Sequence, residues 1–533
     1  MRTLVLGDPV VHLGDDDWIA DGALVIEDGK VADVGPRSRF AGGTFDEVLG
    51  GPDHFVLPGF VNCHFHSEAA LGHGVYELIF ERANIWMHST FVRMREEDLH
   101  NAVLTLLIAA IRGGQTGVVD MYYGNPNLPA YGADVVLDAY EQIGLRVAFG
   151  LVTRDQNRYV HQSDDAFRAC LPAHLAQELQ RSPIGYAWPV DDVLGTYRRL
   201  AADWDRRDGR IRTILAPDWT PACSDDLYRR ARALADEHDT GITTHALETR
   251  SEMSFNFAQY GKAALQRLDD LGVLGEDCSL AHFVWATDAD IDLLAATGSV
   301  CSNDPGSNLR LSSGIARTRD ILERGGRVGF GTDGISFGDR EDFFDELRLA
   351  GLLQRRPMEL ASGRIPSARL LRSAATAGAR AIRFERDLGS LTPGKDADLL
   401  VCRRDHVFWP PARYANADPL DVIVDRADQS DLETVLVKGR AVLRDGEITL
   451  VDEAKVRAAF ADAAANRLYR FADDERRFGL ELPAEIEPYV LDFYERWTEA
   501  PAAPGYAYNT TTGPAGTTGA AAAGGEGHSG VVV

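Results

Sequence analysis

The chain has 533 residues, 45% of them hydrophobic and 26% charged, so it is long enough to bury a large core in more than one structural unit. Its formal net charge of −26 at pH 7 argues against nucleic acid and against an anionic membrane surface as the main partner. The six cysteines are far apart and form no C-x-x-C pair, which excludes a disulfide-rich scaffold and a zinc ribbon.

The N-terminal sequence MRTLVLGDPVVHLGDDD lacks a charged segment followed by an apolar one, so we expect no signal peptide. The longest apolar run, near Val103 to Ile111, is too short to cross a bilayer. Together with the widely spaced cysteines, these features predict a cytoplasmic protein with no membrane partner.

Strand and helix patterns alternate through the middle of the chain. The first 55 residues or so contain short strands interrupted by Gly and Asp, such as TLVLG and ALVIEDG. The eight strands predicted after them cover residues 56–64, 116–121, 145–152, 211–217, 241–246, 278–283, 298–302 and 327–333. The amphipathic helices predicted between them include 98–112, 224–237, 288–296 and 315–323. Eight strands alternating with helices indicate an α/β fold, a closed (β/α)8 barrel of the TIM type.

Strand-like segments return late in the chain, in residues 388–405 and 434–450. We predict that residues 1–55 and 388–450 pair into one small β-sandwich domain, discontinuous in sequence, beside a barrel at 56–387. Apolar residues at helical spacing predict C-terminal helices in 451–499. Residues 500–533 are mostly Pro, Gly, Ala and Thr, which predicts a disordered tail.

Four residues with metal-binding side chains fall at the ends of predicted barrel strands. His64 and His66 end the first strand, and residues i and i+2 of a strand point to the same face. His245 ends the fifth strand and Asp333 the eighth. Taken alone, each is better explained as a core histidine or a strand-end carboxylate. Because active sites of such barrels lie at the C-terminal strand ends, their coincidence predicts one divalent metal held by all four.

Two further residues have the properties of proton-transfer groups. Glu248 follows His245 by three residues, where a carboxylic acid can move a proton from water to a leaving nitrogen. His282 ends the sixth predicted strand and is expected to donate a hydrogen bond in the same cavity. The alternatives are an exposed glutamate in a first helical turn and a purely structural histidine.

Taken together, these residues resemble the amidohydrolase superfamily, in its branch of aromatic deaminases and chlorohydrolases. The resemblance runs from the N-terminus to about residue 450. The segments that carry it are PGFVNCHFH (58–66), GGQTGVVDMY (113–122), THALE (244–248), AHFVWATDADI (281–291), NDPGSNLRLSSGIA (303–316) and GTDG (331–334). LGSLTPGKDADLLV and VKGRAVLRDGE match the composite β domain of that branch.

The resemblance implies one zinc or iron ion on the four ligands, with Glu248 as proton shuttle and His282 as electrostatic partner. Asp333 would also accept a proton from water. Two-metal relatives bridge their ions with a carbamylated lysine from a middle strand, but no lysine lies between Lys30 and Lys262, so we expect a mononuclear site. Dimers are common among the relatives, which implies a homodimer or higher homo-oligomer.

One departure from the branch concerns the substrate. After the fourth strand, where the branch commonly has Ala-Pro-His, this chain has Asp218 followed by Trp219. A carboxylate there predicts a substrate with a donor-rich or cationic edge. Trp86, Trp219 and Trp285 are candidates to stack on a flat ring, ordinary packing being the alternative. Asn308 is a further predicted substrate contact.

Glu248 also bears on the reaction type. Expelling ammonia or an amine from a ring carbon needs a proton donor, whereas chloride leaves unaided. We therefore predict a metal-dependent hydrolytic deaminase of an amino-substituted N-heterocycle of the purine, pyrimidine, pterin or triazine type. The alternatives are a related hydrolase that releases an alkylamine or chloride or opens a cyclic amide, and a catalytically silent binding protein.

Overall fold

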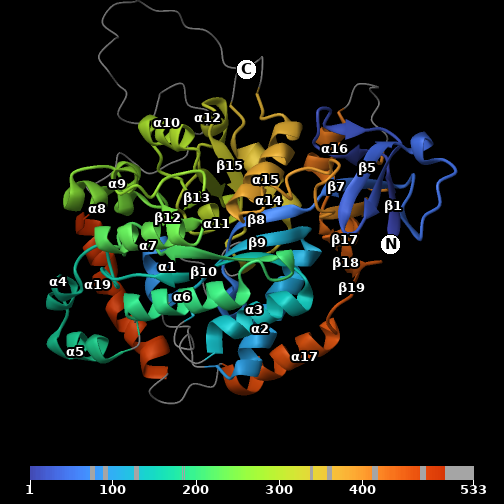
Figure 1. The fold of residues 1–533 in the computed structure, drawn as a ribbon. Helices are drawn as coiled ribbons and strands as arrows, with labels where there is room; N and C mark the ends of the chain where they lie inside the picture. The colour runs from blue at the N-terminus through green and yellow to red at the C-terminus, as the bar shows by residue number, and fades with distance from the viewer. Residues whose placement is uncertain are drawn as a thin grey trace, which may run out of the picture.

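The protein is described by a computed structural model, shown in Figure 1. The structure describes residues 1–72, 79–87, 94–124, 131–182, 184, 187–335, 340–356, 363–410, 418–468 and 476–497. The predicted disordered tail, 500–533, lies outside the described residues. Among the described residues, no helix combines the length and apolar composition needed to cross a membrane.

Eight parallel strands close into a barrel at the centre of the molecule (Figure 1). They are β8 (Phe60–Phe65), β9 (Gln115–Tyr122), β10 (Arg146–Thr153), β11 (Ile211–Pro217), β12 (Ile242–Ala246), β13 (Cys278–His282), β14 (Val300–Asn303) and β15 (Arg327–Phe330). The last strand pairs with the first through Phe330 and Asn62. Strands such as β9 and β10 are buried along their whole length, because side chains fill the barrel on one face and helices cover the other. The predicted barrel is confirmed.

Helices follow the strands and form the outer layer. They are α2 (Glu96–Arg112), α3 (Ala133–Ile143), α6 (Val190–Trp204), α7 (Asp225–Glu237), α8 (Arg250–Tyr260), α9 (Ala264–Asp270), α10 (Asp288–Thr297), α11 (Pro305–Arg310), α12 (Thr318–Glu323), α14 (Phe343–Leu353) and α15 (Ser367–Ala381). Local sequence sets their ends. In α10, Thr287 and Asp290 form a capping box, and Gly298 ends the helix with φ of 72°.

Two further sheets lie beside the barrel (Figure 1). One has the order β5 (Lys30–Pro36), β4 (Gly22–Glu27), β1 (Arg2–Gly7) and β6 (Glu47–Gly50). The other has the order β19 (Glu447–Ile448), β18 (Arg440–Arg444), β17 (Leu432–Val437), β16 (Leu399–Arg403), β7 (His54–Pro58), β2 (Val10–Val11) and β3 (Trp18–Ile19). Antiparallel pairing of β7 with β16 joins the two distant parts of the chain. The domain boundaries at residues 55, 388 and 450 stay predictions.

Helices also follow the last sheet strand. Helix α17 (Glu453–Ala463) packs on α2. Helix α19 (Leu482–Trp497) packs on α1 (Phe80–Met87), on α5 (Ala173–Arg181) and on α8, and in Figure 1 it runs, in red, along the side of the barrel between α8 and α5. The helix α4 (Asp164–Ala169) precedes α5 in the connection after β10.

Candidate active site

Three histidines and one aspartate converge at the C-terminal mouth of the barrel. His64 lies in β8, His66 directly follows it, and His245 lies in β12. One ring nitrogen of each histidine lies within 4.8 Å of those of the other two. Asp333, which follows β15, places Oδ1 at 3.2 Å from Nε2 of His64 and 3.3 Å from Nε2 of His66. The structure therefore brings together all four predicted metal ligands.

Hydrogen bonds behind the rings set their orientation. Nδ1 of His66 donates to the carbonyl oxygen of Met121 at 2.6 Å, and Nδ1 of His245 donates to that of Asp218 at 2.7 Å. A carbonyl can only accept, so the neutral form of each ring carries its lone pair on Nε2, which faces the common point. Ser307 donates to Oδ2 of Asp333 at 2.6 Å, which leaves Oδ1 facing the histidines.

The donor set fits a divalent cation. His64 is fully buried; among the described residues its Nδ1 has no hydrogen-bond partner, and its Nε2 faces Oδ1 of Asp333 and the other two imidazoles. Such an imidazole costs free energy unless something else contacts its lone pair, and three imidazoles with one carboxylate are ligands that zinc prefers. Burial lowers the pKa of His64 well below its usual range, so it is in the neutral form that binds metals.

The Asp333 carboxylate is ionised in this setting. Burial by itself would raise its pKa, but the attraction of His64 and its hydrogen bonds with His64 and His66 outweigh burial, so the pKa lies well below the usual range. For His66, burial favours the neutral ring, but Asp333 outweighs it and raises the pKa to about 9. A proton and a cation therefore compete for Nε2 of His66.

The backbone is strained where these side chains enter the cavity. Leu247, His282 and Asp333 have φ of 57°, 71° and 62°, in the left-handed region. A non-glycine residue there costs about 1–3 kcal/mol and persists only when the surroundings impose it. Gly334 follows with φ of 102°, and a Cβ on it would lie 2.8 Å from Cβ of Ala69. The strain turns the chain sharply after each strand, which aims His282 and Asp333 at the metal ligands.

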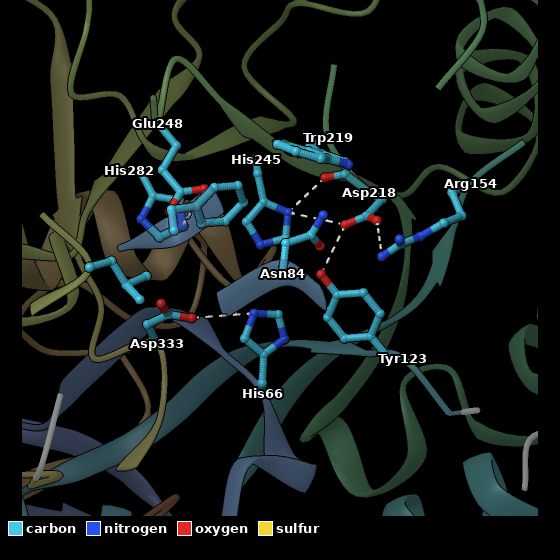
Figure 2. Close-up of a pocket in the computed structure, with 12 residues that line it drawn as sticks. His66, Asn84, Tyr123, Arg154, Asp218, Trp219, His245, Glu248, His282 and Asp333 are labelled. Atoms are coloured by element: carbon cyan, nitrogen blue, oxygen red, sulfur yellow. Dashed lines mark hydrogen bonds and ion pairs between the residues drawn. The ribbon is translucent and has the colours of Figure 1, made fainter. Parts of the chain in front are cut away.

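Glu248 and His282 lie on the same side of the cavity (Figure 2). Nε2 of His282 is 3.8 Å from Oε2 of Glu248. Burial, and then the charge of Asp333, raise the pKa of Glu248 well above its usual range, which favours its protonated form. Burial lowers the pKa of His282 to about 4, so its ring is neutral.

The tautomer of His282 follows from its neighbours. Nδ1 lies 3.0 Å from Oδ1 of Asn308, which only accepts, and 3.5 Å from Oδ2 of Asp304. Nδ1 therefore carries the proton, and Nε2 faces the cavity as an acceptor. This arrangement differs from the donor role expected from the sequence, because donation from Nε2 would need a second proton that the low pKa disfavours.

A cavity of about 410 Å³, part of it open to solvent, lies in front of these groups. Its lining residues are His66, Phe80, Asn84, Tyr123, Arg154, Asp218, Trp219, His245, Glu248, His282, Leu311 and Asp333. The lining includes Asp218 and Trp219, as the sequence predicts, but neither Trp86 nor Asn308. Trp86 donates its indole N–H to Glu487 in α19, and Asn308 contacts His282 from behind. Trp285 donates to the carbonyl oxygen of Ser313 and is likewise absent from the lining.

Asp218 is part of a paired cluster across the cavity from Glu248 and His282 (Figure 2). Its Oδ2 lies 2.5 Å from a guanidinium nitrogen of Arg154, and its Oδ1 accepts from the Tyr123 hydroxyl at 3.0 Å. Arg154 balances the charge of the carboxylate, so a cationic substrate edge is not needed there. The Arg154 pair thus removes the reason to expect that Asp218 binds a cationic edge of the substrate.

Several residues at the site were not predicted from the sequence. Tyr123, Arg154 and Asp304 directly follow β9, β10 and β14, so their place at strand ends was a usable signal. Phe80 and Asn84 belong to α1, which contacts the cavity only through tertiary packing. No local pattern could have found them.

Comparisons with known proteins agree with this geometry. Residues 55–442 match the Amidohydrolase family. The chain is 31% identical over 470 residues to a 5'-deoxyadenosine deaminase of Methanothermobacter thermautotrophicus, covering 87% of this chain and 98% of that protein. It is 29% identical over 474 residues to a 5-methylthioadenosine/S-adenosylhomocysteine deaminase of Desulforamulus reducens, covering 87% and 98%. An adenosine deaminase structure from Xanthomonas campestris with bound zinc has a TM-score of 0.74 at 25% identity, covering 88% and 99%.

These matches confirm the family resemblance and the predicted reaction class. The Amidohydrolase match spans more than half of the chain, and it includes the strands that carry His64, His245 and Asp333. The protein is a member of the amidohydrolase family and a hydrolase that acts on carbon–nitrogen bonds other than peptide bonds.

Proposed function

We propose that the protein is a metal-dependent hydrolytic deaminase that removes the 6-amino group of an adenosine-type nucleoside. The observation that carries this proposal is the position of Glu248 beside His282, both lining one cavity with Asp333 at the mouth of the barrel. A carboxylic acid held in its protonated form suits the departure of nitrogen, which leaves only after it gains a proton. The deaminase names of the relatives support the nucleoside.

We further propose that His64, His66, His245 and Asp333 hold one divalent ion, zinc in preference to iron. The nitrogen and oxygen donors suit zinc, and the deaminase structure from Xanthomonas campestris holds zinc. In such sites the ion supplies Lewis acidity, which makes water a nucleophile near neutral pH. A single ion agrees with the absence of lysine between Lys30 and Lys262.

The protein's own groups then have distinct tasks. Nε2 of His282 accepts a hydrogen bond from the attacking water and orients it, because Asn308 holds the Nδ1 proton on the other side of the ring. Asp333, ionised at neutral pH, accepts a proton from that water. Glu248 gives its proton to the substrate nitrogen. The water oxygen bonds to the ring carbon, the carbon–nitrogen bond breaks, and ammonia leaves with the proton from Glu248. The water proton held by Asp333 then passes to Glu248 and restores its acid form.

The cavity walls fit a planar base. Phe80 and Trp219 lie with ring centroids 5.2 Å apart, and Leu311 adds an apolar surface. The Arg154–Asp218 pair and the Tyr123 hydroxyl provide a polar wall on the side opposite Glu248. An apolar cleft with a few oriented polar groups is typical of sites for small heterocyclic molecules.

Ammonia release from a substrate panel tests the proposal. The zinc-loaded protein is assayed with adenosine, 5'-deoxyadenosine, 5'-methylthioadenosine, S-adenosylhomocysteine, guanine, cytosine, a pterin and atrazine. We expect ammonia from one or more of the adenosine compounds and a slower reaction with the others. Release of chloride from atrazine without ammonia from any purine would refute it. Oligomeric state and cytoplasmic location stay predictions, the first testable by light scattering.

A further inference from the structure

Helix α1 forms one wall of the active-site cavity. Its residues Phe80 and Asn84, one helical turn apart, line the cavity. Phe80 also donates its backbone N–H to the carbonyl oxygen of Leu311, another lining residue, at 3.1 Å. The position of α1 therefore sets the size and shape of the cavity where these side chains line it.

The opposite face of α1 contacts α19, near the end of the described chain. Nε of Arg82 donates to Oε1 of Glu487 at 2.6 Å, and the indole N–H of Trp86 donates to Oε2 at 3.0 Å. One carboxylate thus accepts from two residues of α1, and the Glu487 side chain is only 15% exposed, which strengthens both contacts. Figure 1 shows α1 and α19 on the same side of the barrel.

Apolar contacts support the same arrangement. Leu482, Ile486 and Val490 follow each other at intervals of four residues and form a buried face of α19. That face belongs to one cluster with Ile85 of α1 and with residues of α4 and α5, such as Phe167 and Leu175. Ion pairs alone would leave α1 free to slide, whereas this interdigitated cluster specifies its position.

A second line of contacts runs from α19 to Trp219 in the cavity wall. Tyr494 lies seven residues after Glu487, so the two share one face of the helix. The Tyr494 ring contacts His161 edge to face at 5.3 Å between centroids, and His161 contacts Trp219 at 4.7 Å. Trp219 lines the cavity and contacts Phe80. Helix α19 therefore supports both aromatic walls.

We propose that α19 is a specificity element, with Glu487 as the positioning residue that holds α1 over the cavity and thereby sets the affinity for substrate. The family match ends at residue 442, so α19 lies outside the part of the chain that the family shares. The effect on substrate rests on the proposed function, because a bound nucleoside would contact Phe80 and Asn84 in the cavity lining. The effect on the position of α1 does not rest on it.

The test compares Glu487→Gln and Glu487→Ala with Asp492→Asn in the full-length protein. Asp492 is the matched control, because it lies on the same helix and, among the described residues, pairs with Arg496 of that helix alone. The glutamine keeps an oxygen acceptor for Trp86 but loses the ion pair with Arg82. Circular dichroism and thermal unfolding establish which variants fold; should Glu487→Ala not fold, the isosteric Glu487→Gln decides.

Hydrogen–deuterium exchange of the α1 amides is the first measurement, since it needs neither metal nor substrate. We expect faster exchange across residues 80–87 in the Glu487 variants and wild-type exchange there in Asp492→Asn. Steady-state kinetics with the best adenosine compound is the second. We expect KM to rise roughly three- to tenfold with kcat within about twofold, because fewer molecules have a binding-competent α1.

The two measurements separate this inference from the proposed function. Faster α1 exchange without deamination of any nucleoside would keep the role of α19 in positioning α1 and refute the proposed function. Unchanged α1 exchange in folded Glu487 variants would overturn the inference, whatever the substrate. A fall in kcat at constant KM, or the same KM rise in Asp492→Asn, would also overturn it.

Discussion

The two ends of strand β10 each carry a buried arginine, and the two arginines have opposite surroundings. Arg146 begins the strand and donates to Asp398 at 2.7 and 2.9 Å, to Asp396 at 2.8 Å and to the carbonyl oxygen of Gly209 at 2.8 Å. Arg154 follows the strand and pairs with Asp218 in the wall of an open cavity. The Arg146 side chain is fully buried between two carboxylates, whereas Arg154 lines the cavity where substrate would bind.

The difference extends to the whole barrel. At the Arg146 end, charges of opposite sign are matched across the junction between β10 and the segment that precedes β16. At the Arg154 end, the acidic groups Glu248, Asp304 and Asp333 lie close together, and burial, together with the charge of Asp333, raises the pKa of the first two well above their usual ranges. The first arrangement favours stability, while the second costs stability and creates reactive groups.

The largest effect we expect is on activity at the cavity. Glu248→Gln should reduce kcat for ammonia release roughly 10²- to 10⁴-fold, because the amide cannot transfer a proton. The free energy of unfolding should stay the same or rise, since the variant removes a buried acid beside Asp333. Activity assays and urea unfolding measure the two quantities. If Glu248→Gln lost stability as well as activity, the cavity end of the barrel would not differ from the Arg146 end in the way we infer.

At the other end, the expected effect is on stability. Arg146→Ala should lower the free energy of unfolding by about 3–5 kcal/mol, because Asp396 and Asp398 would remain buried without their main partner. The kcat of the folded protein should not change. Arg199→Ala is the control, as its bidentate pair with Asp134 is exposed and worth about 0–1 kcal/mol. Equal losses in the two variants would contradict this expectation.

The third prediction concerns how stability depends on pH through His161, a buried histidine behind the cavity wall. Burial lowers the pKa of His161 from 6.5 to about 3. In the unfolded chain the ring is protonated below about pH 6.5, so its contribution to stability is complete above that pH and is lost as the pH falls toward 3. At pH 5 the loss is on the order of 2 kcal/mol. His161→Phe should lose about 2 kcal/mol less unfolding free energy between pH 7 and pH 5 than the wild type, as measured by urea unfolding. The same loss in the variant and the wild type would contradict this prediction.

The smallest effect concerns the paired wall of the cavity. Asp218→Asn should raise KM about tenfold, or about 1.4 kcal/mol, because Arg154 loses its counter-charge and the polar wall loses its order. The kcat should change less, since the backbone carbonyl that holds His245 remains. Asp134→Asn is the matched surface control. A loss of kcat at constant KM would instead indicate that the Asp218 side chain positions the His245 ring.

The barrel strands and the candidate metal ligands could be predicted mainly from hydrophobic periodicity and from residue positions at strand ends. Seven of the barrel strands lie close to where the alternation of apolar runs and helices places them. The first, predicted at 56–64, is divided: His54–Pro58 pairs with β16 in the side sheet, and the barrel strand begins at Phe60. His64 and His66 are predictable as neighbours because a strand repeats every two residues. Such patterns are local, so they can be read without knowledge of the fold.

Contacts between segments that are far apart in the chain could not be predicted from the sequence. Trp86 has the character of a stacking residue, but its indole N–H contacts Glu487, 401 residues away. Asp218 has the character of a free carboxylate, but Arg154 balances it. Each outcome depends on which of many polar groups lies within about 3 Å in the folded state, and no spacing in the chain encodes that distance.

By itself, the sequence determined the barrel, the strand ends that hold the four candidate ligands, and the presence of an acid at Glu248, because each depends on residue type and short-range periodicity. Only the tertiary structure decided the tautomer of His282, the pairing of Asp218 and the support of α1 by α19. These depend on which side chains meet after the chain has folded, and on how burial shifts their pKa values.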